Sequence, residues 1–542
     1  MKIKSQHSVM NFAVAFIGLL LGIQATGCAA AEVQKPNVVL IVCDDLNDYI
    51  TGIPSQTGHP QARTPHVEKL AESGVAFRRA YSNNPVCAPS RSSFLTGIYP
   101  HTSGNLFWDK WFYNPVLKNS KTVMEHFRDN GYQVLGSGKL MHHFKKEVWG
   151  EFKHLTDYGP FVYDGKDRVA HPSVPQPYGS IGPVDGSYAP LSDVPYADDD
   201  DPKTGWIYGG WGKVKPLKYT SEDDRDPTPD ERNAAWAAGQ IAKFAEQKQD
   251  KPFFMAVGFI RPHTPLHVPK KYFDMFPLDS VQAPLIKQGD AEDTHFKEVI
   301  DKNSKGLRYF RTLNESYDDP DTAIKNFTRA YLACVAAVDD CIGQVVEAVD
   351  NSDLKDNTII VLTSDHGWQM GQKDFLFKNS PWEESTRIPF IVRAPGVTKA
   401  GGVAEHPISL IDLYPTLVDL CGLTGDTRKN ENGAKLDGFS VRPFLEDPDR
   451  QKWDGPDAAL SMVFGGKPTE DATKEETDRL TNQNWTVRTK RWRYIRYNNG
   501  TEELYDHEND PREWNNLADD PKFKSQKKKM SKQLESMVPL KK

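Results

Sequence analysis

Apolar and polar positions follow two recurring patterns along this chain: short continuous apolar runs, and longer stretches with an apolar residue every three to four positions. Residues 37–43 and 358–363 are continuous apolar runs, which predict strands covered on both faces. Further strands are predicted at 74–77, 134–135 and 253–259, and helices at 67–73, 122–130, 230–247 and 322–349. Helices that alternate with buried strands predict an α/β sandwich around a large, mostly parallel sheet.

One long insertion departs from this pattern. Residues 155–229 are rich in Pro, Gly, Asp and Tyr, and they include four consecutive aspartates at 198–201. An insertion of this length without regular structure predicts either a functional loop or a surface excursion held together by its own aromatic residues. The sequence leaves both interpretations open.

The C-terminal part shows a third pattern. Residues 448–480 are polar and rich in Pro, Gly and Asp, which indicates a boundary. Residues 485–497 then alternate with period two, and Asn498-Asn-Gly500 predicts a turn into a strand at 502–505. We therefore predict a large domain over 32–447 and a smaller unit with an antiparallel sheet over 448–542.

The first 31 residues have the composition of an export signal. Lys2 and Lys4 precede an apolar stretch at 9–23, and small residues follow it. Ala-Thr-Gly before Cys28 resembles the bacterial lipobox, in which the cysteine carries a lipid anchor. We therefore expect an exported protein that resides in the bacterial periplasm, is anchored through Cys28 as a lipoprotein, or is secreted.

Composition narrows the function classes. The formal net charge of -7 over 542 residues argues against a nucleic-acid partner, which requires a concentrated basic surface. Six cysteines in a chain of this length do not form a disulfide scaffold. Cys334 and Cys341 lie roughly 10 Å apart along one predicted helix, too far for a bond. Cys43 falls in an apolar strand, so Cys87 is the cysteine that needs a chemical explanation.

Cys87 begins the segment Cys-Ala-Pro-Ser-Arg91, and residues 92–97 after it predict the start of a helix. A helix N-terminus presents free backbone N–H groups and a positive dipole end, which suit a tetrahedral anion. Arg91 adds a bidentate donor for the same kind of anion.

Acidic residues follow two of the predicted strands. Asp44 and Asp45 end the first strand, and Asp365 and His366 end the strand at 358–363. The carboxyl ends of parallel strands meet at one edge of a sheet, so these four side chains are expected to lie together. Adjacent buried carboxylates predict a hard dication, Ca²⁺ in preference to Mg²⁺.

Cationic side chains follow other strands. Lys139 and His142 come after the strand at 134–135, and His263 after the strand at 253–259. Lys378 lies twelve residues beyond His366. Singly, each lysine is more typical of a solvated surface charge and each histidine of a structural residue.

Cys-x-Pro-Ser-Arg followed by Leu-Thr-Gly resembles the signature of the type I sulfatases, and the other motifs occur in that family's order. The resemblance extends from about residue 36 to 518 and is strongest to the iduronate-2-sulfatase-like branch, which has a histidine where His366 stands. It implies an alkaline-phosphatase-like fold, a bound Ca²⁺, and a Cys87 oxidised to formylglycine (3-oxoalanine) by a formylglycine-generating enzyme. It assigns metal ligation to position 87 and to the four residues at the strand ends.

The resemblance also implies a mechanism. Hydrated formylglycine attacks sulfur, while Arg91, Lys139 and Lys378 neutralise the sulfate oxygens. His263, with Lys378, protonates the leaving oxygen, and His142 assists the release of sulfate. The expected activity is that of a sulfuric ester hydrolase on a sulfated, polysaccharide-derived carbohydrate.

Several residues are candidates for the walls of a substrate pocket, although each is more typical of a structural role when taken singly. They are His101, Trp108, Arg261, His267, Trp206 and Trp211. Two alternative functions remain open. One is a phosphonate monoester or phosphodiester hydrolase of the same superfamily, and the other is a catalytically silent glycan-binding protein with an unmodified Cys87.

Overall fold

The computed structural model describes residues 35–196, 204–210, 213–248, 251–299, 304–467 and 469–540. The predicted export signal, Cys28, the aspartates at 198–201 and Trp211 lie outside these ranges. From Lys35 onward, the described residues form one compact unit.

The main sheet has eight strands in the order β15-β2-β14-β12-β1-β10-β4-β5. Its strands are β1 (Asn37–Asp44), β2 (Val75–Phe77), β4 (Gln133–Gly138), β5 (Glu151–Phe152), β10 (Phe253–Pro262), β12 (Thr358–Ser364), β14 (Phe390–Arg393) and β15 (Gly402–Ala404). Strand β14 runs antiparallel to both of its neighbours, and the other pairs are parallel. The predicted mostly parallel sheet is therefore confirmed, with every residue of β1 buried.

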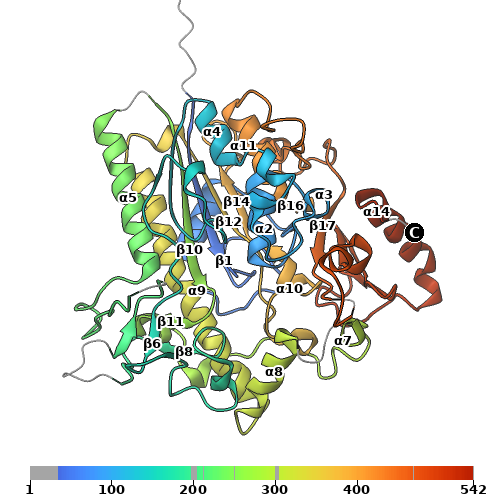
Figure 1. Ribbon diagram of the computed structural model, residues 1–542, viewed down its shortest axis with the longest axis horizontal. Helices are drawn as coiled ribbons and strands as arrows, with labels where there is room; N and C mark the ends of the chain where they lie inside the picture. Colours follow the sequence, from blue (N-terminus) through green and yellow to red (C-terminus); the bar gives the residue numbers. More distant parts are fainter. Residues whose placement is uncertain are drawn as a thin grey trace, which may run out of the picture. The chain divides into compact units, whose positions relative to one another are not determined.

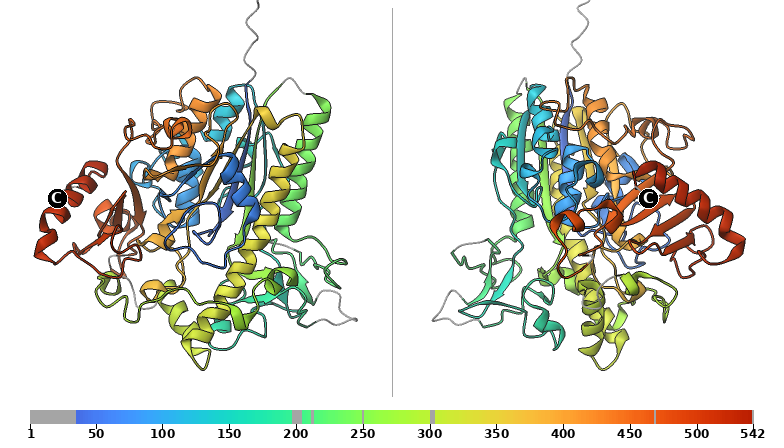
Figure 2. Two further views of the ribbon diagram at one scale, coloured as in Figure 1. Left: turned by 180° about the vertical axis from the view of Figure 1, so that it is seen from behind. Right: turned by 45° about the vertical axis from the view of Figure 1, so that its right-hand side comes forward.

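Alternate residues of β1 enter two different cores. Val39 and Ile41 pack on the face covered by α1 (Pro65–Ser73), α5 (Pro229–Gln247) and α9 (Pro320–Asp350). Val38 and Leu40 pack on the opposite face, with α2 (Cys87–Thr96), α4 (Val123–Asp129), α11 (Leu413–Cys421) and α12 (Arg442–Glu446). Figures 1 and 2 show this three-layer arrangement, with α5 and α9 side by side on one face. The strands read as continuous apolar runs because both of their faces are covered.

Local signals explain why the predicted helices begin where they do. Thr122 and Glu125 form a capping box at the start of α4, and Thr228 and Glu231 form another at α5. The Asp319 side chain caps α9, which carries the two free cysteines expected there. Among the residues described, no helix has the length and hydropathy needed to cross a membrane.

The C-terminal sheet is antiparallel and contains β17 (Ala458–Val463), β18 (Asn484–Thr489), β19 (Trp492–Arg496) and β20 (Glu502–Asp506). The run at 485–497, predicted as one strand, is two strands joined by a turn at Lys490 and Arg491. Helix α14 (Lys524–Met537) packs Met530 and Leu534 against this sheet. The antiparallel sheet is confirmed, and the boundary at residue 448 stays a prediction.

The insertion at 155–229 contains regular structure that its composition did not predict. Strands β6 (Phe161–Tyr163), β7 (Arg168–Val169) and β9 (Gly205–Ile207) form a small sheet. Trp206 lies buried in a separate apolar cluster with Val162 and Leu191, and its indole N–H donates to the Leu191 carbonyl. Aromatic residues hold the described part of this insertion together.

Candidate active site

The carboxyl ends of β1 and β12 meet as the sequence predicted. Cys43 pairs in parallel register with Ser364, so the residues that follow each strand are adjacent. The Asp45 N–H donates to Asp365 Oδ1 at 3.3 Å, and Asp45 has a positive φ of 64°. Asp44, Asp45, Asp365 and His366 are all fully buried.

Helix α2 delivers position 87 to this edge. The helix begins at Cys87, five residues earlier than the sequence suggested, and all ten of its residues are buried. The hydroxyl of Ser90 donates to the Asp365 carbonyl at 2.6 Å, which ties the first turn of the helix to the end of β12. Gly97 ends the helix in the left-handed region, where a side chain would meet Leu436 at 2.5 Å.

Three nitrogen atoms surround the sulfur of Cys87. Lys378 Nζ lies 3.1 Å, His366 Nε2 3.3 Å and Lys139 Nζ 3.6 Å from Sγ. Lys378 Nζ also lies 2.8 Å from Asp45 Oδ1, and Lys139 Nζ pairs with Asp44 Oδ2. Each lysine therefore joins position 87 to one carboxylate.

Arg91 occupies the other side of the carboxylates, one helical turn after Cys87. Its Nε donates to Asp365 Oδ2 at 2.9 Å, and its Nη1 donates to the Lys139 carbonyl. Arg91 Nη2 lies 3.5 Å from Asp44 Oδ1, and both of these buried atoms lack a hydrogen-bond partner within the described residues. Arg91 thus links α2 to the ends of three strands.

Burial and ion pairing set the charges here. Burial raises the pKa of Asp45, and the ion pair with Lys378 opposes this shift. Burial acts in the same sense on Asp44, but Lys139 and other cations outweigh it and hold the pKa of Asp44 well below its usual range. Burial lowers the pKa of both lysines, but Asp44 and Asp45 outweigh it and raise each pKa above its ordinary value. Burial and Asp44 raise the pKa of the Cys87 thiol, which favours the protonated thiol at neutral pH.

The two predicted catalytic histidines occupy different places. His263 Nδ1 lies 2.5 Å from the Thr264 carbonyl, so Nδ1 carries the hydrogen and Nε2 faces Asp45 Oδ2 at 3.8 Å. Burial and then Lys378 lower the pKa of His263 well below its ordinary value. The His142 ring packs at a tilt against Trp108 with ring centroids 4.5 Å apart, and burial with Lys139 lowers the pKa of His142 to about 3. Both imidazoles are therefore neutral in this environment.

The donor set fits a hard dication. Ligand atoms of Asp44, Cys87, Asp365 and His366 lie within 4.8 Å of one another. His366 Nδ1 lies 3.1 Å from the Gly367 carbonyl and must donate to it, which leaves the Nε2 lone pair directed toward the centre, 3.3 Å from Cys87 Sγ. The buried Asp44 Oδ1 without a hydrogen-bond partner is a further available ligand atom. Carboxylates suit Ca²⁺ or Mg²⁺, whereas the imidazole is the softer member of the set.

The predicted pocket residues are scattered. Trp108 is 42% exposed and covers His142, as a pocket wall would. Arg261 is buried and donates to the His263 and Gly159 carbonyls, so it positions backbone. Trp206 in the insertion and His267 on β11 (Leu266–Val268) are buried against each other, and the polar atoms of both side chains are bonded to residues of the insertion. None of the hydrogen bonds or ring contacts of these two side chains within the described residues is to the residues around Cys87.

His101 is also placed away from the centre. Its ring stacks on Tyr99 and meets Trp485 edge-on, and burial lowers its pKa to about 4. None of its ring contacts within the described part of the chain is to the residues around Cys87. Trp211, the remaining candidate, lies outside the described residues.

Tyr158 was not found from the sequence. Its ring lies 4.6 Å from Lys139 Nζ and 5.1 Å from the His263 ring, so it forms a wall of the site. Tyr331 on α9 was also missed; its hydroxyl donates to the Asp45 carbonyl at 2.7 Å. Tyr158 lies in a loop, where no periodic pattern points to it. Tyr331 is one of many buried residues on the apolar face of a long helix, so its sequence position does not distinguish it.

Comparison with known proteins agrees with this geometry. Residues 36–423 match the family described as Sulfatase, and residues 366–539 match N-sulphoglucosamine sulphohydrolase, C-terminal. A sulfatase of Formosa agariphila is 33% identical over 94% of this chain and 89% of its own length. An ulvan-active sulfatase of the same organism is 28% identical over 91% of this chain and 79% of its own length.

The expected branch and fold are supported as well. The iduronate 2-sulfatase of Mus musculus is 25% identical over 76% of this chain and 74% of its own length. A phosphonate monoester hydrolase from Silicibacter pomeroyi has the same fold, with a TM-score of 0.66, 23% identity, and coverage of 92% of this chain and 94% of its own. The alkaline-phosphatase-like architecture is therefore confirmed. The chain belongs to the sulfatase family and is a sulfuric ester hydrolase.

Proposed function

We propose that this protein hydrolyses sulfate esters on a sulfated carbohydrate, through a formylglycine formed from Cys87 and with a bound Ca²⁺. The observation that carries the proposal is the setting of Cys87, which lies at a helix N-terminus with Lys139, Lys378 and His366 around its Sγ. A relative with carbohydrate specificity in its name, the ulvan-active sulfatase, supports the substrate class.

The proposed cation would be held by Asp44, Asp45, Asp365 and His366, together with position 87. These residues supply buried carboxylates and one imidazole lone pair directed toward position 87, and carboxylate oxygens are the ligands that Ca²⁺ prefers. A bound dication supplies positive charge that polarises a sulfate oxygen and favours an ionised nucleophile. Formylglycine, once hydrated, supplies that nucleophile as a hydroxyl group.

The chain's own cations orient the sulfate group. Lys139 and Lys378 flank position 87, and both stay charged because of their pairing with Asp44 and Asp45. Arg91 adds a rigid guanidinium fixed by Asp365. Fixed cations around the sulfate group of the substrate stabilise a transition state in which negative charge moves across the sulfate oxygens.

His263 is the proposed proton donor to the leaving oxygen. Its Nδ1 hydrogen is committed to the Thr264 carbonyl, so only Nε2 can exchange a proton with substrate. Burial and Lys378 lower the pKa of His263 in the free protein. An anionic sulfate bound between Lys139 and Lys378 would raise the pKa of His263, because a nearby negative charge favours the protonated imidazole. His142, which packs against Trp108, is the proposed group that assists sulfate release.

The deciding experiment is sulfate release from a panel of defined sulfated oligosaccharides by protein made with a formylglycine-generating enzyme. We expect turnover by the wild type, and loss of activity by about 10⁴-fold or more in Cys87→Ala because the nucleophile is absent. Chelation should remove activity and Ca²⁺ should restore it. Parallel assays on phosphonate and phosphate esters test the alternative, since a phosphodiester preference of several orders would overturn the proposal.

Metal binding can be tested without activity. Ca²⁺ is expected to raise the melting temperature of the wild type and to have little effect on Asp365→Asn. Asp340→Asn is a matched control, because Asp340 belongs to another cluster of potential ligands with His66 and Asp339. Equal Ca²⁺ shifts in wild type and Asp365→Asn would contradict the proposed cation site.

The location of the protein also remains a proposal. We infer from residues 1–31 that the chain is exported, with or without a lipid at Cys28. Growth with labelled palmitate followed by fractionation tests both parts. Label in the chain that disappears in Cys28→Ala indicates a lipoprotein, whereas unlabelled chain in the periplasm indicates plain export.

A further inference from the structure

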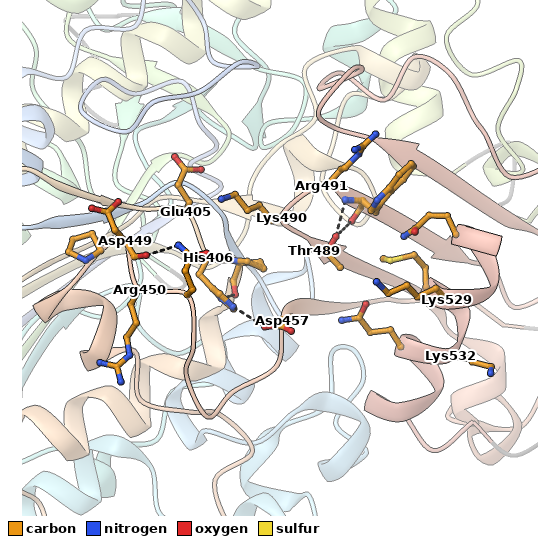
Figure 3. Close-up of a pocket in the computed structure, with 17 residues that line it drawn as sticks. Glu405, His406, Asp449, Arg450, Asp457, Thr489, Lys490, Arg491, Lys529 and Lys532 are labelled. Carbon is orange, nitrogen blue, oxygen red and sulfur yellow. Dashed lines mark hydrogen bonds and ion pairs between the residues drawn. The ribbon is translucent and has the colours of Figure 1, made fainter. Parts of the chain in front are cut away.

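A groove of 660 Å³ among the described residues shares no lining residue with the Cys87 centre. One wall comes from His406 and the loop at 448–451, and the other from the β18–β19 turn and helix α14 (Figure 3). The groove therefore lies where the main sheet's edge meets the C-terminal sheet. Its volume is within the range of cavities that hold organic ligands.

The groove is positively charged within a chain of net charge -7. Five cationic side chains line it, against three acidic ones. Two of the charges are already neutralised, because Glu405 pairs with Arg78 and Arg79, and Arg491 pairs with Asp506 and Glu508.

The remaining cations form no ion pair within the described residues, and Arg450 Nε donates only to the Lys452 carbonyl there. Arg450, Lys490, Lys529 and Lys532 are exposed, and no carboxylate of the described residues lies within ion-pair distance of them. On the acidic side, Asp457 faces His406 at 3.4 Å, and only Asp449 has no such neighbour in the described chain. The excess charge in the groove is therefore available to an anion.

The spacing on α14 turns several donors toward one side. Gln526, Lys529 and Gln533 are separated by three and four residues, which places them on one face of the helix. The half-buried Trp492 adds a flat aromatic surface, held against Arg491 at 4.8 Å and Phe523 at 5.8 Å. Ammonium groups, amides and an indole face together recognise a chain of sugar rings that carries anionic substituents.

We propose that this groove is a second, non-catalytic binding site for a sulfated polysaccharide chain. The proposal rests on the proposed function, because it identifies the polymer whose sulfate esters the Cys87 centre would cleave. Binding away from the catalytic centre would keep the enzyme on an extended polymer between turnovers.

The test compares two triple variants with equal charge changes. Lys490→Gln/Lys529→Gln/Lys532→Gln removes three groove cations, and Lys522→Gln/Lys524→Gln/Lys528→Gln removes three exposed lysines that do not line the groove. The probe is dextran sulfate, with uncharged dextran as its control, measured by affinity electrophoresis near physiological salt. We expect the groove variant to bind dextran sulfate about tenfold more weakly and the control variant to change by about twofold or less.

The proposal would be overturned if dextran sulfate binding weakened equally in both variants, or if it weakened in neither. It would also be overturned if the groove variant still bound dextran sulfate and lost only its binding to phosphatidylserine vesicles. The last result would assign the groove to an anionic membrane surface. Turnover of 4-nitrophenyl sulfate, a small substrate, is expected to be the same in both variants and the wild type. If no sulfate ester is cleaved but dextran sulfate binding depends on the groove lysines, the proposed function fails and the groove site stands.

Discussion

The Nζ atom of Lys378 contacts two groups, Asp45 Oδ1 at 2.8 Å and Cys87 Sγ at 3.1 Å. Lys378→Met should lower kcat/KM for sulfate ester hydrolysis by about 10²–10³, because it removes a fixed positive charge from a water-excluded site. Lys270→Met is the control, since Lys270 is exposed and pairs with Asp274 outside the site. Steady-state kinetics on matured protein measure both. Activity of Lys378→Met within threefold of wild type would show that this lysine only pairs with Asp45.

The buried carboxyl of Glu384 predicts a pH dependence of the protein's stability. This carboxyl is buried, and burial followed by repulsion from Glu513 and Asp48 raises its pKa from 4.5 to about 8. The folded protein therefore keeps a proton that the unfolded chain loses between these values. Between pH 4.5 and about 8, Glu384 therefore lowers the free energy of unfolding by up to about 1.4 kcal/mol for each unit that the pH rises.

Glu384→Gln should remove this penalty, because glutamine stays neutral at every pH. The melting temperature of the variant should be close to that of the wild type at pH 5 and above it at pH 9. Melting curves across this range provide the measurement. Parallel pH profiles for the two proteins would mean that Glu384 is already ionised in the folded state near neutral pH.

Single residues also show what the sequence could predict. Asp44, Asp45, Asp365 and His366 were found because each follows a buried strand, and strand ends share an edge. His101 and His267 could not be assigned in this way, since an isolated histidine carries no information about which neighbours enclose it. Their contacts to Trp485 and Pro160 join segments far apart in the sequence.

At the scale of elements, the strands and long helices were predictable and the insertion was not. Strands β1 and β12 are continuous apolar runs, and helices α5 and α9 have recurring apolar positions and capping residues. The small sheet in the insertion uses strands of two or three residues, which are too short for a periodic signal. The turn between β18 and β19 was missed because Lys490 and Arg491 are not typical turn residues.

Helix α2 carries a prediction about maturation. Cys87 is 1% exposed and stands at the first position of a fully buried helix. For the proposed maturation of Cys87, we therefore expect a formylglycine-generating enzyme to reach this thiol only before the chain folds. It should convert a peptide spanning residues 80–97 and leave folded, unmodified protein unchanged. Mass spectrometry of the Cys87 peptide provides the readout, and efficient conversion of the folded protein would contradict the burial argument.

At the scale of the whole molecule, α10 (Glu383–Thr386) joins the C-terminal sheet to the catalytic part of the chain. The Glu383 carboxylate accepts hydrogen bonds from two arginines of the C-terminal sheet, from Arg488 Nε at 3.2 Å and from the guanidinium of Arg493. It also accepts a hydrogen bond from the hydroxyl of Tyr81 at 2.9 Å. Glu513 accepts the N–H of Glu383 at 3.1 Å and pairs with Arg493. This buried network lies a few residues after Lys378, so it couples the C-terminal sheet to the position of a lysine for which we propose a catalytic role.

Arg493→Met tests whether the two sheets unfold together. Arg493 is fully buried, and its loss leaves Glu383 and Glu513 with fewer compensating charges in a dry environment. We expect a destabilisation of about 3–5 kcal/mol, because breaking a buried pair leaves an uncompensated carboxylate. Arg496→Met on the same strand is the control, since Arg496 forms only a surface pair with Glu535 at 3.4 Å and should contribute about 1 kcal/mol or less. If the network joins the sheets, calorimetry should show one transition at a lower temperature, with aryl sulfate activity lost in that same transition. Two separate transitions in Arg493→Met, with activity retained through the first, would show that the catalytic part is stable without the C-terminal sheet.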